Sequence, residues 1–262
     1  MKRRNFIGST VFALSATVAG GLAYPSLQEA VARNKNKAEW KYTGEGGPEN
    51  WGEVSPDYAV CQAGVQQSPV DLAQPISATL SDLQIDSQPV NLRILHNGHT
   101  IRLNTEPGNT LTLDGSKFEL VQFHFHLPSE HTVKGEPYPM EVHFVHQGET
   151  GFAVLGVFFK EGKENIALKE IWDAMPTQKQ PESLIPGVTI EIASLLPPNR
   201  STYRYFGSLT TPPCSEVVRW VVFEEPIEIS REQIEQFRQI FPLNARPIQS
   251  LNRRFLLYGN ES

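Results

Sequence analysis

Most of the chain after residue 33 consists of short segments in which apolar and polar residues alternate, separated by Gly, Pro, Asn and Asp. Alternation with a period of two is typical of strands that bury one face, and frequent turn residues between strands favour an antiparallel sheet. The predicted strands are Val90–Leu95, His99–Asn104, Thr110–Asp114, Phe118–His126, Met140–Gln147, Phe152–Lys160, Val188–Ile192 and Glu216–Phe223.

Good helix signals are few. Ser230 and Gln233 have the spacing of a capping box, in which each side chain accepts from the backbone amide of the other residue. The apolar stripe that follows consists of Ile234, Phe237, Ile240 and Phe241. Pro242 ends this helix, and a second helix is predicted over Asn165–Ala174. Because no linker-like segment divides residues 33–262, we expect a single, mainly β domain with short peripheral helices.

Residues 1–32 are predicted to be an export signal rather than part of the fold. Lys2-Arg3-Arg4 is followed by a weakly apolar stretch, Phe6–Ala23, and then by the small-x-small pattern of Ala30-Val31-Ala32. The paired arginines resemble a twin-arginine signal. The alternative is an uncleaved anchor, but the stretch contains Ser, Thr and Gly and lacks the roughly 20 strongly apolar residues of a membrane span. We therefore expect residues 33–262 in the periplasm or outside the cell, without stable membrane insertion.

Composition and charge narrow the range of partners. Charged residues make up 20% and hydrophobic residues 39% of the chain, as in ordinary globular proteins. The net charge is −6, and no run of Lys and Arg follows the first four residues, which argues against nucleic acid. The sequence carries no signal for the oligomeric state.

Cys61 and Cys214 are the two cysteines of the chain. In a reducing compartment they would be two unrelated small apolar residues. Behind an export signal, an even number of cysteines favours one disulfide bond.

All seven histidines fall between residues 96 and 146. In the predicted strand that ends at His126, alternation places Gln122, His124 and His126 on one face. The opposite face carries Val121, Phe123 and Phe125 and belongs to a core. Burying two imidazoles side by side is costly unless something binds them.

A second strand repeats this pattern, with Glu141, His143 and Val145 on one face. If the two strands are neighbours, His143 completes a three-histidine site. Three neutral imidazoles suit Zn²⁺, and a catalytic zinc site keeps its fourth position for water. Gln122 and Glu141 each lie two residues from a predicted ligand on the same face, where they would accept its second N–H.

Two alternatives remain for this cluster. One is a buried polar network without a metal, and the other is a different metal. Iron is disfavoured because its common non-haem site uses two histidines and a carboxylate, an argument that weakens if Glu141 ligates directly. Three histidines outside the cluster, His96, His131 and His146, are predicted to be packing or surface residues.

From Trp40 to about Phe255 the sequence resembles the α-class carbonic anhydrases, in particular their exported bacterial members. The matching motifs are Trp40-Lys-Tyr42, Gly47-Pro-Glu-Asn-Trp51, Gln67-Ser-Pro-Val-Asp71, Asn97-Gly-His99, Gln122–His126, Ser129-Glu-His131, Glu141-Val-His143, Ala153-Val-Leu-Gly156, Gly207-Ser-Leu-Thr-Thr-Pro-Pro213 and Asn244-Ala-Arg-Pro247. The resemblance implies a large twisted, mostly antiparallel sheet with the metal at the foot of a conical active-site cleft. It also implies a lyase that reversibly hydrates carbon dioxide to bicarbonate and a proton.

The resemblance also implies roles for individual residues. His124, His126 and His143 would hold zinc, and a zinc-bound hydroxide would be the nucleophile. Thr210 would give its one hydroxyl proton to Glu130 and accept from the nucleophile. The substrate pocket would be lined by Val145, Val154, Leu209, Trp220 and Thr211.

His99 matches the proton-shuttle position, and histidine suits this role because it titrates near neutrality. Tyr42 and Asn97 match residues that organise the connecting waters. The alternative for His99 is an exposed turn histidine without a role. Cys61 and Cys214 match the disulfide of exported relatives.

Two departures from the family pattern stand out. The link Leu127–Glu130 is shorter than in many animal relatives and resembles bacterial members. Arg102 stands where a smaller polar residue often lines the cleft. Two other functions remain open, a catalytically silent domain, which typically loses a zinc histidine, and a zinc esterase that acts on another substrate.

Overall fold

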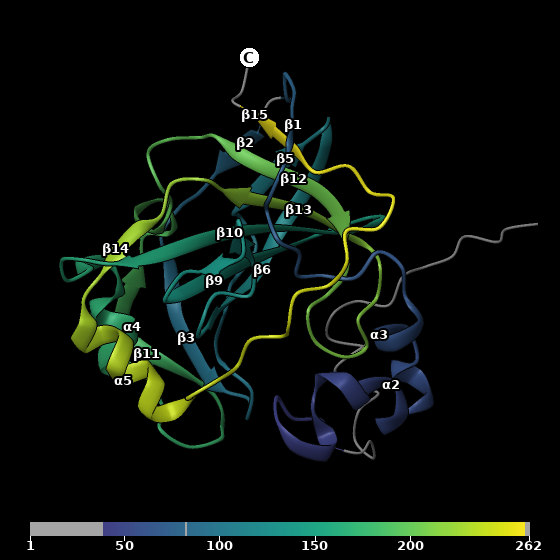
Figure 1. Ribbon diagram of the computed structural model, residues 1–262. Helices are drawn as coiled ribbons and strands as arrows, with labels where there is room; N and C mark the ends of the chain where they lie inside the picture. The colour runs from purple at the N-terminus through teal and green to yellow at the C-terminus, as the bar shows by residue number, and fades with distance from the viewer. Residues whose placement is uncertain (1–38, 82, 260–262) are drawn as a thin grey trace, which may run out of the picture. The chain divides into compact units, whose positions relative to one another are not determined.

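The largest element of the protein is a 13-stranded sheet, shown by a computed structural model that describes residues 39–81 and 83–259 (Figure 1). In spatial order its main strands are β12 (Thr202–Gly207), β13 (Val218–Phe223), β10 (Gly151–Glu161), β9 (Met140–Gly148), β6 (Ser116–His126), β4 (Ile101–Asn104), β3 (Val90–His96) and β11 (Gln180–Ile190). The remaining strands of this sheet are β1 (Ile76–Ser77), β15 (Leu257–Gly259), β14 (Ile227–Ile229), β2 (Leu83–Asp86) and β5 (Thr110–Leu113). A separate pair is formed by β7 (Thr132–Val133) and β8 (Glu136–Pro137). The predicted export signal lies outside the described residues.

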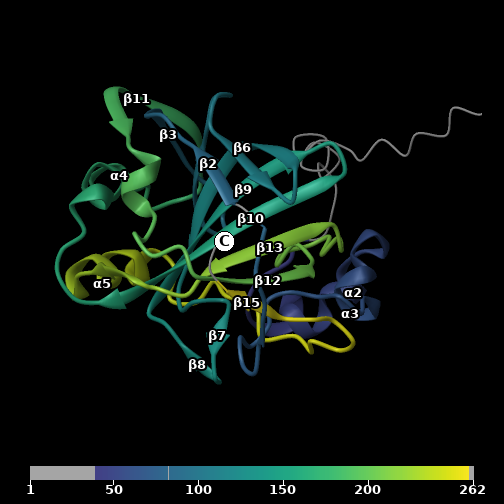
Figure 2. The same ribbon diagram turned by 90° about the horizontal axis from the view of Figure 1, so that it is seen from above.

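Most neighbouring strands are antiparallel. Parallel pairing joins β10 to β13, β10 to β14 and β1 to β15. Figure 2 shows the central strands β9, β10 and β13 running side by side across the middle of the sheet. The mainly β, mostly antiparallel architecture predicted from the sequence is therefore confirmed.

The helices are short and lie at the periphery of the sheet. The α-helices are α2 (Trp51–Val54), α3 (Val60–Ala63), α4 (Lys169–Ala174) and α5 (Arg231–Ile240). The 3₁₀-helices are η1 (Gly44–Gly46), η2 (Pro48–Asn50), η3 (Pro56–Tyr58), η4 (Ile166–Leu168) and η5 (Ile192–Leu195). In both views α4 and α5 lie together on one side, and α2 and α3 lie together on the other (Figures 1 and 2). Within residues 39–81 and 83–259, none of the helices has the length and apolar character needed to cross a membrane.

Both predicted helices are present. At the start of α5, Ser230 Oγ accepts from Gln233 N–H at 3.2 Å, and Gln233 Oε1 accepts from Ser230 N–H at 3.2 Å, so the capping box is confirmed. The other predicted helix begins as η4 and continues as α4. Asn165 caps it by accepting from the backbone N–H of Ala167 at 3.1 Å.

All eight predicted strands have counterparts, and the differences follow from local chemistry. Only the end of β11 was predicted, because this edge strand contains two prolines and a glycine and is interrupted by register shifts. Strand β12, in which all residues but Phe206 are buried, was not predicted from the sequence. The strand predicted to begin at His99 begins at Ile101, since Asn97 Oδ1 accepts from the backbone N–H groups of His99 and Thr100 at 2.8 Å and forms a turn.

The core determines which face of the sheet is polar. On β6, Phe123 and Phe125 are fully buried in the main hydrophobic cluster, and on β9 Val142 and Phe144 join them. Because side chains alternate along a strand, the residues between these positions point to the opposite face. That face carries the histidines of the predicted site.

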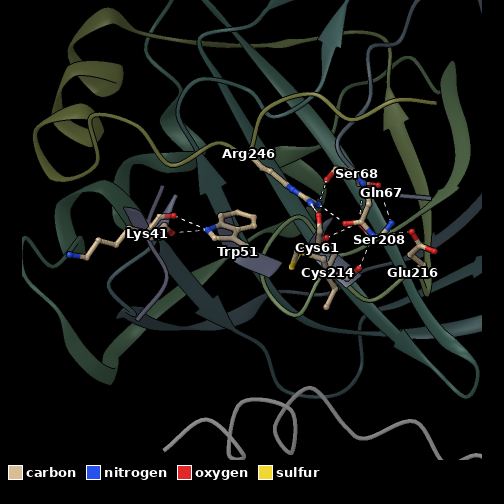
Figure 3. Close-up of a disulfide and its surroundings, with 11 residues drawn as sticks. Lys41, Trp51, Cys61, Gln67, Ser68, Ser208, Cys214, Glu216 and Arg246 are labelled. Atoms are coloured by element: carbon tan, nitrogen blue, oxygen red, sulfur yellow. Dashed lines mark hydrogen bonds between the residues drawn. A yellow bond between two sulfur atoms is a disulfide. The ribbon is translucent and has the colours of Figure 1, made fainter. Parts of the chain in front are cut away.

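Cys61 of α3 is joined by a disulfide bond to Cys214, 153 residues further along the chain. The surrounding polar groups hold both cysteine backbones (Figure 3). Arg246 Nη2 donates to Cys61 O at 2.8 Å, and Gln67 Nε2 donates to Cys214 O at 3.1 Å. The disulfide therefore fastens the N-terminal helices to the segment that follows β12.

We expect replacement of both cysteines by serine to lower the free energy of unfolding by about 4–5 kcal/mol, because a long closed loop restricts the unfolded chain. The measurement is guanidinium unfolding of the protein and of the double variant. Reductant should weaken the protein with the disulfide but leave the double-serine variant unchanged. Equal midpoints for the oxidised and reduced protein would contradict this expectation.

Candidate metal centre

Three histidines meet on the polar face of β6 and β9. His124 lies directly opposite His143 in the strand pairing, and His126 is two residues further along β6. The ring centroids are 4.9 Å apart for His124 and His126, 5.4 Å for His124 and His143, and 4.6 Å for His126 and His143. One ring nitrogen from each lies within 4.8 Å of the others, so the three side chains could hold a metal ion.

In each ring the other nitrogen is engaged by an oxygen. His124 Nδ1 lies 2.8 Å from Gln122 Oε1, and His143 Nε2 lies 2.8 Å from Glu141 Oε1. His126 Nδ1 lies 2.7 Å from the backbone oxygen of Asn244. Since these oxygens act as acceptors, each engaged nitrogen carries the proton, and the opposite nitrogen of a neutral ring presents a lone pair.

The inward nitrogens fit a metal because no hydrogen bond from the described residues occupies them. His126 Nε2 is buried and has no hydrogen-bond partner among the described residues. Burial, followed by the neighbouring histidines, holds the pKa of His124 well below its ordinary value, so this ring is neutral. Imidazoles with inward lone pairs are the donor set that Zn²⁺ prefers, and the acceptors behind them fix their tautomers.

The sequence predicted Gln122 and Glu141 behind the ligands, and the structure brings both to those positions. The sequence did not predict the contact of His126 with Asn244, which lies 118 residues away along the chain. Nothing near His126 in the sequence signals this contact. The match of Asn244-Ala-Arg-Pro247 to a family motif was the one signal in the sequence that pointed to Asn244.

Glu141 is a fully buried carboxylate with four donors. Its Oε2 accepts from the backbone N–H groups of Glu130 and His131, both at 2.9 Å. Its Oε1 lies 2.8 Å from both His131 Nδ1 and His143 Nε2. Burial acts to raise the pKa of Glu141, but His131 and His143 outweigh it and hold the pKa well below its usual value.

A glycine makes room for this carboxylate. Gly156 on β10 pairs with His143, and a Cβ atom at position 156 would lie 2.8 Å from Glu141 Oε1. Any larger residue would therefore displace the acceptor behind His143.

His131, predicted to be a packing or surface residue, is a buried member of this network. Its Nε2 lies 2.7 Å from the Tyr205 hydroxyl, which in turn donates to Ser68 Oγ at 3.0 Å. His131, Glu141 and His143 form a second cluster with metal-binding spacing. Hydrogen bonds already account for the Glu141 oxygens in that cluster.

Glu130 places one carboxylate oxygen beside the histidines. Its Oε1 accepts from the backbone N–H of Arg246 at 2.9 Å. Its Oε2 is buried, lies 3.5 Å from His126 Nε2, and has no hydrogen-bond partner in the described part of the chain. The expected bond from Thr210 to Glu130 is thus not formed in this structure, in which Thr210 is buried.

An apolar row runs across the sheet next to the histidines. Val145 on β9 pairs with Val154 on β10, and Val154 pairs with Trp220 on β13. The Trp220 ring lies 4.8 Å from the His143 ring, and its Nε1 donates to Ser208 O at 3.0 Å. The other two predicted pocket residues, Leu209 and Thr211, are half-buried in the segment that follows Ser208.

His99 lies in the turn before β4 and stacks on Trp40, with ring centroids 3.6 Å apart and an interplanar angle of 9°. Tyr42 presents its edge to His99 at a centroid distance of 6.4 Å. Burial, followed by the Lys179 ammonium, lowers the pKa of His99 to about 4. The structure therefore brings Tyr42, Asn97 and His99 together. It adds Trp40, which the sequence flagged only as part of a motif.

Comparison with known proteins places this fold and site in a family. The family model for eukaryotic-type carbonic anhydrase matches residues 46–259. A carbonic anhydrase from Nostoc sp. is 44% identical over 243 residues, which cover 90% of this chain and 92% of the relative. Another, from Pectobacterium carotovorum, is 42% identical over 226 residues, covering 85% of this chain and 92% of the relative.

A solved structure agrees with these sequence matches. The α-carbonic anhydrase from Thermovibrio ammonificans, in complex with the inhibitor sulfanilamide, has a TM-score of 0.82 and 46% identity to this chain. The likeness covers 85% of this chain and 100% of that one. The chain therefore belongs to the eukaryotic-type, or α-class, carbonic anhydrases, a family of enzymes.

Proposed function

We propose that this protein is a zinc enzyme that reversibly hydrates carbon dioxide to bicarbonate and a proton. The observation that carries the proposal is the convergence of three imidazoles, those of His126 and His143 buried and that of His124 half-buried, whose outer nitrogens are all bonded to oxygens. The names of the matched relatives support the same reaction. A catalytically silent domain would not need such a complete donor set.

Zinc would be held by His124 Nε2, His126 Nε2 and His143 Nδ1, the nitrogens that their hydrogen bonds leave free. Zinc bound there supplies a Lewis acid that brings the pKa of a coordinated water to about 7, a value known from carbonic anhydrases themselves. Gln122, Glu141 and the Asn244 carbonyl keep the three rings in one orientation and one tautomer.

Thr210 and Glu130 would orient the attacking oxygen. Glu130 Oε2 is free to accept the Thr210 proton. A hydroxyl has one proton, so after donating it Thr210 faces the nucleophile as an acceptor only. This chain of bonds would select a nucleophile that can donate, and would turn its lone pair toward the substrate.

The apolar row would form the binding site for carbon dioxide beside the metal centre. Val145, Val154 and Trp220 are each at most 3% exposed and lie beside the histidines. Carbon dioxide is small and apolar, so apolar side chains lose little by contacting it in place of water. Leu209 and Thr211 would complete this pocket.

We expect carbon dioxide hydration to be lost on chelation and regained when zinc is restored, measured by stopped flow on the purified protein. His124→Gln should abolish both the activity and the stoichiometric zinc. His96→Asn is the matched control, because the amide oxygen can replace the Nδ1 that accepts from Gly98 N–H. No activity in a folded, zinc-loaded protein would contradict the proposal and favour a silent domain. Ester hydrolysis faster than hydration would point to the esterase.

His99 would carry protons between the site and the buffer, over waters that Tyr42 and Asn97 help to organise. Its pKa of about 4 in the position stacked on Trp40 means that the ring is neutral near pH 7 and free to accept a proton. Proton transfer is more efficient when the pKa of the transferring group is near neutrality. The ring conformation stacked on Trp40 would therefore transfer protons less well than a conformation in which the pKa of His99 is nearer 7.

We expect His99→Ala to lower kcat about tenfold or more in weak buffer, to leave kcat/KM unchanged, and to be partly rescued by added imidazole. The wild-type His99 ring, followed by NMR, should gain its proton only as the pH falls toward about 4. Lys179→Gln should raise this pKa, because it removes a nearby positive charge. Unchanged turnover in the alanine variant would assign proton transfer to another group.

Residues 1–32 would direct export through the twin-arginine route, and residues 33–262 would form the exported enzyme. The Cys61–Cys214 disulfide supports an oxidising destination, the periplasm or the exterior. Replacing Arg3 and Arg4 by lysines should trap the precursor in the cytoplasm, as measured by fractionation. Normal export of that variant would indicate the general secretory route.

A further inference from the structure

Arg102 is a cation beside the candidate metal centre. It lies on β4, and its backbone pairs with that of His124 on β6. Paired residues on neighbouring antiparallel strands point to the same face, with Cβ atoms about 4.5–5.5 Å apart. Arg102 therefore shares the face of the sheet that carries the histidines. Its positive charge also acts on His124.

The Arg102 guanidinium has no hydrogen-bond partner among the residues that the structure describes. Its Nε is buried and lacks a hydrogen bond, and no other residue in 39–81 or 83–259 forms an ion pair with it. Glu182 attracts Arg102 electrostatically but is committed elsewhere. Arg93 Nη2 lies 2.7 Å from Glu182 Oε1, and Asn104 Nδ2 donates to Glu182 Oε2 at 2.6 Å.

A second arginine of the same sheet shows the contrast. Arg93 on β3 is paired with Glu182 at 2.7 Å and with Glu106 at 3.3 Å. Its charge is therefore balanced within the chain, whereas that of Arg102 is not. The two residues form a matched pair for experiment.

The Gln122 side chain, on the strand next to Arg102, also offers hydrogen-bond donors on this face. Asn104 lies two residues along β4 and pairs with Gln122 on β6. Gln122 uses its oxygen for His124 Nδ1, which leaves its amide N–H groups without a partner among the described residues. A ligand between Arg102 and Gln122 would thus meet donors from both side chains, and it must supply acceptor oxygens.

We infer that Arg102 and Gln122 form a binding position for a small planar oxyanion, and that bicarbonate occupies it on entering or leaving the candidate metal centre. The inference rests on the proposed reaction, in which the neutral carbon dioxide becomes an anion. A planar guanidinium matches a planar oxyanion by parallel hydrogen bonds. The net charge of −6 repels anions from most of the protein. Bicarbonate therefore gains the most favourable electrostatic interaction beside a cation whose charge is not balanced within the chain.

The direct test is an NMR titration of the arginine Nε–H signals of the zinc-loaded protein, at constant ionic strength, with nitrate and with bicarbonate. Nitrate has the shape and charge of the expected ligand but undergoes no reaction. The Arg102 signal, assigned by its absence in Arg102→Gln, should shift saturably with both anions. Urea, which is planar and neutral, should not shift it, and the Arg93 signal should move little.

A second readout uses inhibition of carbon dioxide hydration by nitrate. Arg102→Gln should raise the inhibition constant about five- to tenfold, the loss of a charge-assisted hydrogen bond. Arg102→Lys should recover part of this loss, and Arg93→Gln should leave the constant within about twofold, since that charge is already balanced. Both glutamine variants should fold, because Arg102 has no partner to lose and Arg93 is half-exposed.

Two results would overturn the inference. One is an Arg102 signal that neither anion shifts. The other is an equal rise of the inhibition constant in Arg102→Gln and Arg93→Gln, which would indicate only a general field of positive charge. Failure of the proposed function looks different, because a folded, zinc-loaded protein without hydration activity can still show the NMR shift.

Discussion

The structure around the candidate centre depends on one buried carboxylate, Glu141. Removing a charge from water costs several kcal/mol unless hydrogen bonds replace the lost hydration. Glu141 receives those bonds from the backbone of Glu130 and His131 and from two imidazoles. The segment after β6 must therefore fold back over β9, and this return brings Glu130 beside the histidines. One electrostatic requirement thus positions both a candidate ligand and a candidate catalytic carboxylate.

A second buried charge connects this arrangement to the disulfide. The Arg246 backbone N–H donates to Glu130, and its guanidinium donates to the backbone oxygens of Cys61 and Ser68. These contacts join segments more than 100 residues apart, with separations of 116, 178 and 185. Such long closures are slow and entropically costly to form. A disulfide that restricts the unfolded chain offsets part of that cost.

The sequence predicted those features that local periodicity encodes. Alternation on β6 and β9 separated Phe123 and Phe125 from His124 and His126, because a buried apolar face and a polar face differ at every second residue. It could not predict the Asn244 carbonyl behind His126, because any residue can offer a backbone oxygen and this one is far away along the chain. The role of His131 was missed for a related reason. Its partners, Glu141 and Tyr205, come from β9 and β12, and β12 was not among the predicted strands.

The polar atoms beside the candidate centre differ in how fully their hydrogen bonds are satisfied. Glu141 has every acceptor filled, as expected of a group whose task is to hold others in place. In the part of the chain that the structure describes, Arg102 Nε, His126 Nε2 and Glu130 Oε2 are among the buried side-chain atoms without a hydrogen bond, and these three belong to the region of the candidate centre. Buried polar atoms without partners are rare in folded proteins because each destabilises the native state. For Arg102 Nε and His126 Nε2 the proposed anion and zinc would supply the missing partner, and for Glu130 Oε2 the Thr210 hydroxyl would supply it, so part of the stability of the fold is given up where binding is required.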